Sequence, residues 1–197
     1  MGTRTSRVAY LAVGLSNPGS EYAGTRHNVG GSAVALVAAR HAAKLRRERG
    51  LSAAVAEVTS PNGRVALAVP ETYMNDSGAA VGPLVKRYLD GGTDRLIVVH
   101  DELDLEPGTV RVKIGGGTAG HNGLKSIHQH LGTLEFIRVR IGIGKPPGRS
   151  DGARYVLGRP GKREQETLDV SVEIAADAIW KVVEQGPDVA MNEVNRT

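Results

Sequence analysis

Two short, uninterrupted apolar runs constrain this fold most, "VAYLAVGL" at 8–15 and "RLIVVH" at 95–100. Runs of this length that stop at turn residues are typical of strands buried on both faces. Segments with helical periodicity lie between these and the other predicted strands. Strands that interleave with helices predict the α/β class, here as a single domain with a twisted mixed β-sheet flanked by helices.

The remaining elements follow from periodicity and from turn residues. A hairpin is expected around Ser60–Gly63, between strands over 53–58 and 65–69. Further strands are expected over 109–114 and 136–143, and helices over 29–45, 77–89, 124–131 and about 168–182. The length of 197 residues favours one domain over 1–197, in which 187–197 is either a short helix or a loose tail.

Two of the predicted strands carry paired cations. Arg111 and Lys113 share one face of their strand, and Arg138 and Arg140 share one face of theirs, because strand side chains alternate. A solvated sheet face explains this pattern, and so does a phosphate-binding surface on which several cations act together. From these residues alone, both interpretations stay open.

Composition limits the chemistry and the partners. The chain has no cysteine, which excludes disulfides, thiolate nucleophiles and cysteine zinc sites. The net charge of +4 and the isoelectric point near 9.5 favour an anionic partner. No apolar run is long enough to span a bilayer, and no secretory signal begins the chain, so a cytoplasmic protein without a membrane partner is expected.

The residues suited to catalysis are a histidine, an aspartate and several asparagines. His27 precedes a predicted helix, and Asp101 directly follows the strand at 95–100. A carboxylate that accepts an imidazole N–H orients the ring as a general base, although a capped or exposed histidine is the commoner case. Asn17, Asn75 and Asn122 lie at loop junctions, where an amide can bind a substrate or simply stabilise a turn or a helix end.

Gly115, Gly117 and Gly120 have the G-x-G-x-x-G spacing of a dinucleotide-binding turn. Such a turn leads straight into a helix and is followed by an acid about 20 residues later. Here the stretch 121–123 intervenes and Glu135 is a poor match for that acid. We therefore interpret the glycines as a mobile loop that lets the backbone approach a substrate, and no cofactor is expected.

Four blocks of sequence resemble the bacterial peptidyl-tRNA hydrolases in order and spacing. They are "VGLSNPGSEYAGTRHNVG", "PETYMNDSG", "HDELDLEPGTVRVKIGGGTAGHNGLKSI" and "FIRVRIGIGKP", and "YVLGRP" at 155–160 is similar to a later, weaker motif. The resemblance covers about residues 8–146. It implies a monomeric α/β enzyme that cleaves the ester between a peptide and the 3′ end of tRNA without a metal.

The resemblance also implies roles for single residues. His27 would activate water, Asp101 would hold and polarise His27, and Asn17 would help to select N-blocked peptides, with Asn75 also in the catalytic set. The residues expected to contact peptidyl-tRNA are Tyr22, Tyr73, Asn75 and Asn122 in the cleft and Arg111, Lys113 and Arg140 at the tRNA backbone. A non-catalytic RNA-binding protein on the same fold is the alternative, and retention of the histidine, aspartate and asparagines argues against it.

Overall fold

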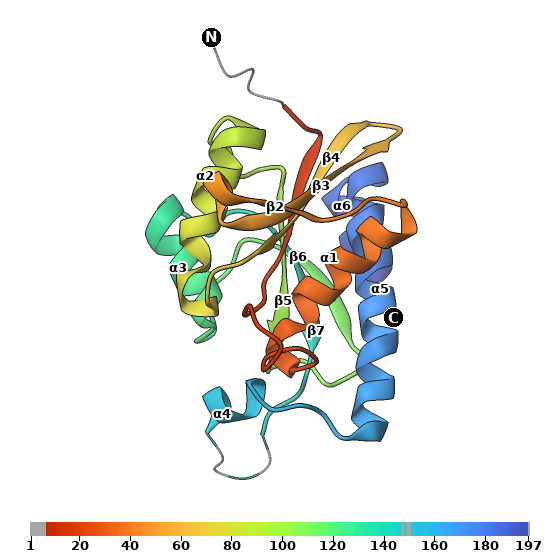
Figure 1. Ribbon diagram of the computed structural model, residues 1–197. Coiled ribbons are helices and arrows are strands. Elements are labelled where there is room, and N and C mark those ends of the chain that lie inside the picture. The colour runs from red at the N-terminus through yellow and green to blue at the C-terminus, as the bar shows by residue number, and fades with distance from the viewer. Residues whose placement is uncertain (1–6, 147, 149–150, 197) are drawn as a thin grey trace.

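A computed structural model describes residues 7–146, 148 and 151–196, and it has one seven-stranded sheet (Figure 1). The N-terminal residues 1–6, on which the expectation about a signal segment partly rests, lie outside the described residues. The strands are β1 (Tyr10–Gly14), β2 (Arg46–Glu48), β3 (Ala53–Ser60), β4 (Gly63–Pro70), β5 (Leu96–Glu102), β6 (Val110–Ile114) and β7 (Ile137–Gly142).

The sheet is mixed, and its order is β2-β3-β4-β1-β5-β7-β6. The central strands β4, β1, β5 and β7 are parallel, whereas β2, β3 and β6 run antiparallel to their neighbours. The two apolar runs of the sequence are β1 and β5 at the centre, where every residue of β5 is buried. The predicted α/β class with a mixed sheet is confirmed.

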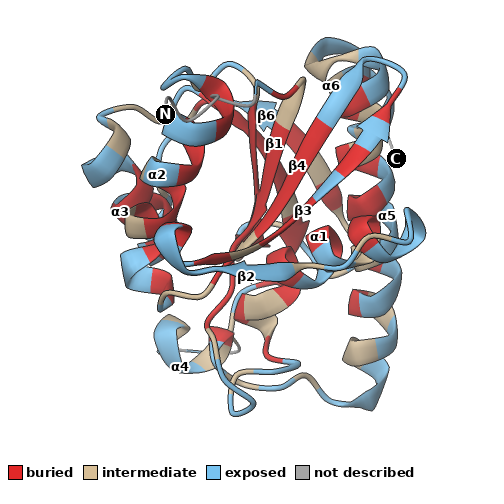
Figure 2. Ribbon diagram, turned by 45° about the horizontal axis from the view of Figure 1, so that its top comes forward, coloured by how far each residue is buried: buried red, intermediate tan, exposed pale blue. Residues whose placement is uncertain are grey.

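Helices cover both faces of the sheet (Figure 1). On one face lie α2 (Ser77–Leu89) and α3 (Asn122–Leu131), and on the other lie α1 (Val29–Arg40), α5 (Lys162–Gln185) and α6 (Pro187–Val194). The short helix α4 (Gly152–Val156) lies at one end of the sheet. In Figure 2 the buried residues follow the central strands and the inner sides of these helices.

Helix α1 is shorter than the predicted helix over 29–45. It ends at Arg40, and Ala42 then has a φ of 50°, a left-handed conformation that ends the helical path. Arg46 to Glu48 instead form the edge strand β2 on β3. The prediction that this helix continues to residue 45 is therefore wrong, because tertiary pairing outweighs local helical pattern here.

Two glycines bring the start of α1 against the sheet. A Cβ on Gly14 would lie 2.3 Å from the carbonyl oxygen of Gly30, and a Cβ on Gly30 would lie 2.2 Å from that of Val99. Only glycine permits backbones to approach so closely. This contact places the residues just before α1 beside the carboxyl end of β5, which is where a parallel sheet presents its functional groups.

The C-terminal segment is helical, and it is hydrogen-bonded to the edge strand β6. Of the two alternatives for residues 187–197, the helix is present as α6, and Ala190 is fully buried. Beyond α6, the Asn195 side chain accepts a hydrogen bond from the Val112 amide at 2.8 Å and donates one to the Val112 carbonyl at 2.9 Å. Asn195 thus occupies backbone groups of β6 that could pair with another chain.

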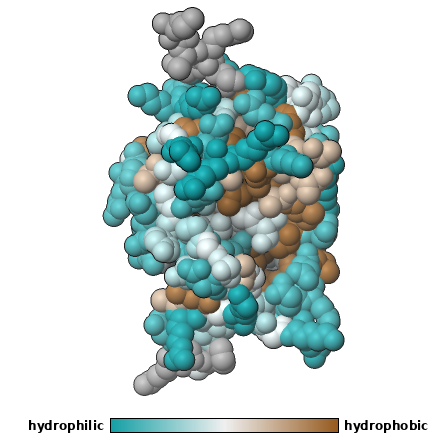
Figure 3. Space-filling view, in the orientation of Figure 1, coloured by the Kyte–Doolittle hydropathy of each residue, from teal (hydrophilic) through white to brown (hydrophobic). Residues whose placement is uncertain are grey.

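Hydrophilic side chains cover much of the face in Figure 3, and hydrophobic ones gather in its middle, around α1. Among the described residues, no helix combines the length and the apolar character needed to cross a membrane.

Candidate active site

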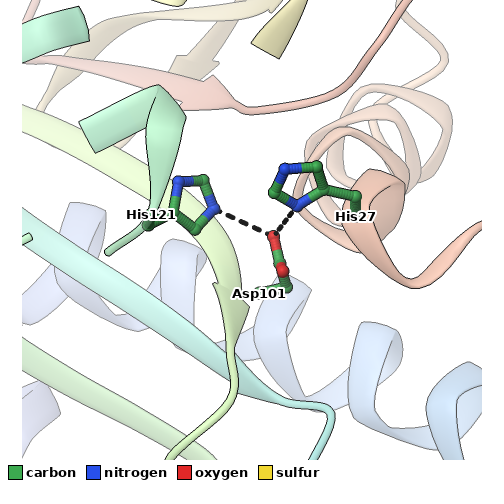
Figure 4. A group of neighbouring side chains, drawn as sticks. All are labelled: His27, Asp101 and His121. Carbon is green, nitrogen blue, oxygen red and sulfur yellow. Dashed lines mark hydrogen bonds and ion pairs between the residues drawn. The ribbon is translucent and has the colours of Figure 1, made fainter. Parts of the chain in front are cut away.

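The predicted base and its carboxylate meet at the carboxyl end of β5 (Figure 4). His27 lies in a 3-10 turn over Arg26–Asn28 that leads into α1, and Asp101 is the penultimate residue of β5. His27 Nδ1 lies 2.8 Å from Asp101 Oδ1, and the two residues are only 7% and 2% exposed. A buried hydrogen bond between an imidazole and a carboxylate is the arrangement that orients a general base.

The carboxylate determines which nitrogen of His27 is basic. An ionised carboxylate can only accept hydrogen bonds, so Nδ1 donates to it and the neutral ring carries its lone pair on Nε2. His27 lines two adjoining pockets, and Nε2 points away from Asp101 (Figure 4). His27 can therefore take a proton from a molecule in this cleft while Asp101 stabilises the resulting cation.

The residues on either side of His27 anchor its turn. Arg26 makes a bidentate ion pair with Glu164 of α5, at 2.6 and 2.7 Å, and its guanidinium lies 4.2 Å from the ring centroid of Tyr155. Asn28 accepts from the backbone amide of Asn17 and donates to the Asn17 carbonyl, both at 2.9 Å. The turn that carries His27 is thus held by helix α5 on one side and by the loop after β1 on the other.

A second histidine contacts the same carboxylate oxygen. His121 Nε2 lies 3.0 Å from Asp101 Oδ1, and its ring centroid is 5.0 Å from that of His27 (Figure 4). Burial alone would raise the pKa of Asp101, but the neighbouring His121 and His27 reverse this effect and hold that pKa well below its usual range. Asp101 is therefore an anion at neutral pH.

The ligand atoms of His27, Asp101 and His121 lie within 4.8 Å of one another, a spacing that could hold a metal ion. The hydrogen bonds around His121 do not fit such a site. His121 Nδ1 accepts the amides of Gly123 and Leu124, at 3.1 and 3.4 Å, so the proton of the neutral ring is on Nε2, the atom that a metal would need. The arrangement fits a hydrogen-bonded group better than a metal centre.

His100, the residue before Asp101, is buried in its neutral form. Its Nδ1 donates to the Asp101 carbonyl oxygen at 2.7 Å, and its ring meets that of His121 edge-on at 5.1 Å. Burial lowers the pKa of His100 to about 3, with smaller contributions in the same direction from His121 and Arg138, and Asp101 opposes this shift only in part. The protonated form is thus strongly disfavoured in the folded protein.

His100 predicts a loss of stability in acid. The pKa of His100 in the folded protein lies below its ordinary value of 6.5, so between these two values the unfolded chain binds the extra proton. The stabilisation is complete above about pH 6.5 and falls as the pH decreases, and His100 should account for about 2 kcal/mol of lost unfolding free energy between about pH 7 and pH 5. Urea unfolding of the wild type and of His100→Gln measures this. An equal loss in both proteins would contradict the prediction.

The predicted substrate-binding residues gather around the adjoining pockets. Both pockets share His27 and Asn122, and one of them is also lined by Asn17, Tyr22, Tyr73 and Asn75. The rings of Tyr22 and Tyr73 meet edge-on at 6.2 Å, and Tyr73 is 57% exposed. Neither Asn75 nor Asn122 is an N-cap, because the N-cap of α2 is Asp76 and that of α3 is His121. Their side chains are exposed and available to a ligand.

Asn17 has a fixed amide orientation. Its Oδ1 accepts the backbone amide of Met74 at 2.7 Å, and a backbone N–H can only donate, so the oxygen must be on that side. The Nδ2 group is then the part of the amide available to the adjoining pocket. Asn17 therefore offers a hydrogen-bond donor to a ligand there.

The predicted cationic face is formed by β6 and β7. Arg111 lies directly opposite Arg140, and Lys113 lies opposite Arg138, so the four cations share one face. Arg111 and Arg140 are partly exposed and Lys113 is exposed, whereas Arg138 is only 3% exposed. Like charges directly opposite one another destabilise a sheet. This face is therefore suited to an anion that relieves the repulsion.

Buried Arg138 holds the glycine-rich loop at 115–123 in place. It donates to the carbonyl oxygens of Gly116 and Gly117, at 2.6 and 2.5 Å. A dinucleotide turn instead directs backbone N–H groups at a phosphate. His121 also separates the glycines from α3, as the sequence indicated. The structure therefore supports the interpretation of this stretch as a loop beside the cleft, while the mobility of the loop stays a prediction.

Sequence reasoning did not select His121. His121 lies within the glycine-rich stretch 115–123, and histidine is not among the residues that usually cap helices. The only available signal was its place just before a helix that begins with Asn122. The contact between His121 and Asp101 depends on folding across 20 residues of sequence.

Comparisons with known proteins agree on one family. A family model described as peptidyl-tRNA hydrolase matches residues 11–197. The peptidyl-tRNA hydrolase of Anaeromyxobacter dehalogenans is 48% identical over 186 residues, which cover 94% of this chain and 96% of that protein. A peptidyl-tRNA hydrolase of Mycobacterium tuberculosis is also 48% identical, over 94% of this chain and 96% of the relative.

Solved structures show the same similarity. The crystal structure of peptidyl-tRNA hydrolase from Acinetobacter baumannii superposes with a TM-score of 0.87 at 37% sequence identity. The match covers 98% of this chain and 97% of that one. The similarity therefore extends over the whole fold as well as the sequence.

Proposed function

This chain belongs to the peptidyl-tRNA hydrolase family, and on that premise we propose how its cleft hydrolyses the ester between a peptide and the 3′ end of tRNA. The products are free tRNA and an N-blocked peptide. The observation that carries the assignment of residues is the 2.8 Å contact between His27 Nδ1 and Asp101 Oδ1, which leaves Nε2 as the base in the cleft.

The reaction begins with a water molecule beside His27. Nε2 takes a proton from the water as its oxygen attacks the ester carbonyl carbon, and Asp101 stabilises the imidazolium that forms. The tetrahedral intermediate then collapses, and the bond to the ribose oxygen breaks. The proton on Nε2 passes to that oxygen, so tRNA leaves with a free hydroxyl. The peptide is formed as a carboxylic acid, which becomes a carboxylate when the second proton of the water is released to solvent.

Asn17 is suited to reading the N-blocking group. Its fixed Nδ2 donor can bind a carbonyl oxygen of a peptidyl or N-acyl group. An unblocked aminoacyl ester has a cationic ammonium group there instead, which cannot accept this hydrogen bond. A polar site that a ligand leaves unpaired discriminates strongly against that ligand. Asn75 and Asn122, with exposed amides at the same pockets, can donate to the oxyanion or hold the peptide.

Arg111, Lys113 and Arg140 would contact the tRNA phosphates. Contacts of this kind give affinity without reading sequence, which suits an enzyme that acts on many tRNAs. We further propose that residues 1–197 form one domain that acts as a cytoplasmic monomer, without a metal or cofactor. The single sheet supports one domain. The hydrogen bonds of His121 support a site without a metal or cofactor.

The decisive experiment compares N-acetylaminoacyl-tRNA with the same tRNA carrying an unblocked amino acid. The purified protein should release the N-acetylamino acid rapidly and spare the unblocked ester. Tight tRNA binding without any release would favour the non-catalytic alternative. Equal release from both substrates would contradict the role given to Asn17.

Arg140→Ala should mainly weaken tRNA binding. Arg140 is partly exposed on the cationic face, and its guanidinium lies 3.8 Å from Glu102, which lines the cleft. Removal of one phosphate contact should raise KM and leave kcat nearly unchanged. The slope of log KM against log salt should decrease by about one, the change that corresponds to one phosphate contact. Steady-state kinetics at several salt concentrations measure this. An effect on kcat alone, independent of salt, would contradict it.

A further inference from the structure

We propose that His121 is a positioning residue for hydrolysis, which holds the Asp101 carboxylate in place against His27 and connects it to the start of α3. The inference rests on the proposed roles of His27 and Asp101. Both ring nitrogens of His121 are engaged: Nε2 contacts Asp101 Oδ1, and Nδ1 accepts the amides of Gly123 and Leu124. Only the neutral tautomer with its proton on Nε2 satisfies both ends.

The hydrogen bond from His121 restricts the rotation of the Asp101 carboxylate, which a hydrogen bond from His27 alone would leave free to turn. The terminal torsion of an aspartate is broad, so a single hydrogen bond from His27 does not determine the plane of the carboxylate. His27 and His121 donate to the same oxygen from different elements, at 2.8 and 3.0 Å. Two donors from different directions define where that oxygen lies, and hence where the base is held.

The ring of His121 is itself held by packing. Its side chain is 8% exposed and lies between the rings of His27 and His100, with centroids 5.0 and 5.1 Å away. A Cβ on Gly123 would lie 3.1 Å from His121 Cε1 and 2.8 Å from Met74 Sδ. Helix α3 thus begins close against the ring, where a larger residue than glycine would not fit without a shift.

The same ring also determines the position of Asn122. Because His121 caps α3, the next residue, Asn122, is held in the first helical turn, where its exposed side chain lines both pockets beside His27. His121 therefore connects the base, its carboxylate and a proposed substrate amide. Displacement of reacting groups by about 1 Å can cost about 100-fold in rate, so this position should matter to kcat.

Two substitutions at His121 test the Nε2 contact with Asp101 and the Nδ1 cap of α3 separately. Asn in place of His121 keeps an oxygen near Nδ1 that can cap α3, but it is too short to reach Asp101. Gln can extend an amide donor toward Asp101, but it caps helices poorly. His121→Asn keeps the cap but loses the packed ring, so it should lower Tm less than His121→Gln does, and it should lower kcat by about 10- to 100-fold with little change in KM. His121→Gln should lower Tm, while its kcat recovers toward the wild-type value.

The matched control is His128→Asn, an exposed histidine on the same helix, which should leave kcat and Tm unchanged. Wild-type kcat in His121→Asn would overturn the proposal, and so would losses of kcat that follow Tm in both His121 variants. Nitrogen-15 spectra of histidine-labelled wild-type protein should show His121 with its proton on Nε2, and a proton on Nδ1 would also overturn it. Failure of the proposed function is distinguishable, because the wild type would then not cleave N-acetylaminoacyl-tRNA.

Discussion

His27→Ala is expected to lower kcat by about 10²- to 10⁴-fold, which is the usual contribution of a general base. The substitution removes the Nε2 lone pair that takes the proton of water, and Asp101 cannot replace it because it is buried behind the ring. Affinity for tRNA should change little, since the cations proposed to contact tRNA belong to β6 and β7, whereas His27 lies in the turn before α1. Single-turnover cleavage of N-acetylaminoacyl-tRNA and filter binding of uncharged tRNA measure the two properties.

The control for this substitution is His128→Ala, which removes an exposed imidazole from α3 and should retain full activity. A His27→Ala protein with near wild-type kcat would refute the role of this histidine as the base. A parallel loss of tRNA binding and of Tm would show instead that the substitution disturbs the fold.

Asp101→Asn should produce the second large effect, a decrease in kcat of about 10²- to 10⁴-fold. His27 and His121 both donate to Oδ1, so an asparagine oxygen in the same place can keep both hydrogen bonds. What the substitution removes is the negative charge. The imidazolium formed on His27 during attack then loses its counter-ion in a buried site, where charges interact strongly.

Two measurements test this interpretation of Asp101. KM should change much less than kcat, because the charge acts on the transition state rather than on substrate binding. Asp101→Ala should lose more thermal stability than Asp101→Asn, because it leaves two buried imidazole N–H donors unpaired. If Asp101→Asn retained wild-type kcat, orientation rather than charge would be the contribution of this residue.

Most of the architecture could be predicted from local pattern. The apolar runs that became β1 and β5 identify central strands, because strands buried on both faces need no polar alternation. The edge strand β2 could not be predicted in this way. Arg46 to Glu48 is polar and follows a helical pattern, and only pairing with β3 makes it a strand.

Part of the candidate site could likewise be predicted from the sequence, and part of it could not. The sequence indicated His27 and Asp101 because each lies at an element boundary, and the resemblance to a family supplied their roles. The sequence did not indicate that His121 contacts the carboxylate of Asp101. It placed Arg138 on the cationic face, but did not indicate that Arg138 is buried and donates to two loop carbonyls. Both residues look like ordinary polar residues until the chain folds.

The α/β class, the absence of cysteine chemistry and the residue types available for proton transfer all follow from the amino-acid sequence alone. These properties depend on the periodicity and identity of residues, which any stretch of chain carries locally. Only the tertiary structure decided which imidazole nitrogen is basic, which cations are exposed and which second histidine holds the carboxylate. Hydrogen-bond direction and burial are properties of groups that meet across the fold, so no local pattern contains them.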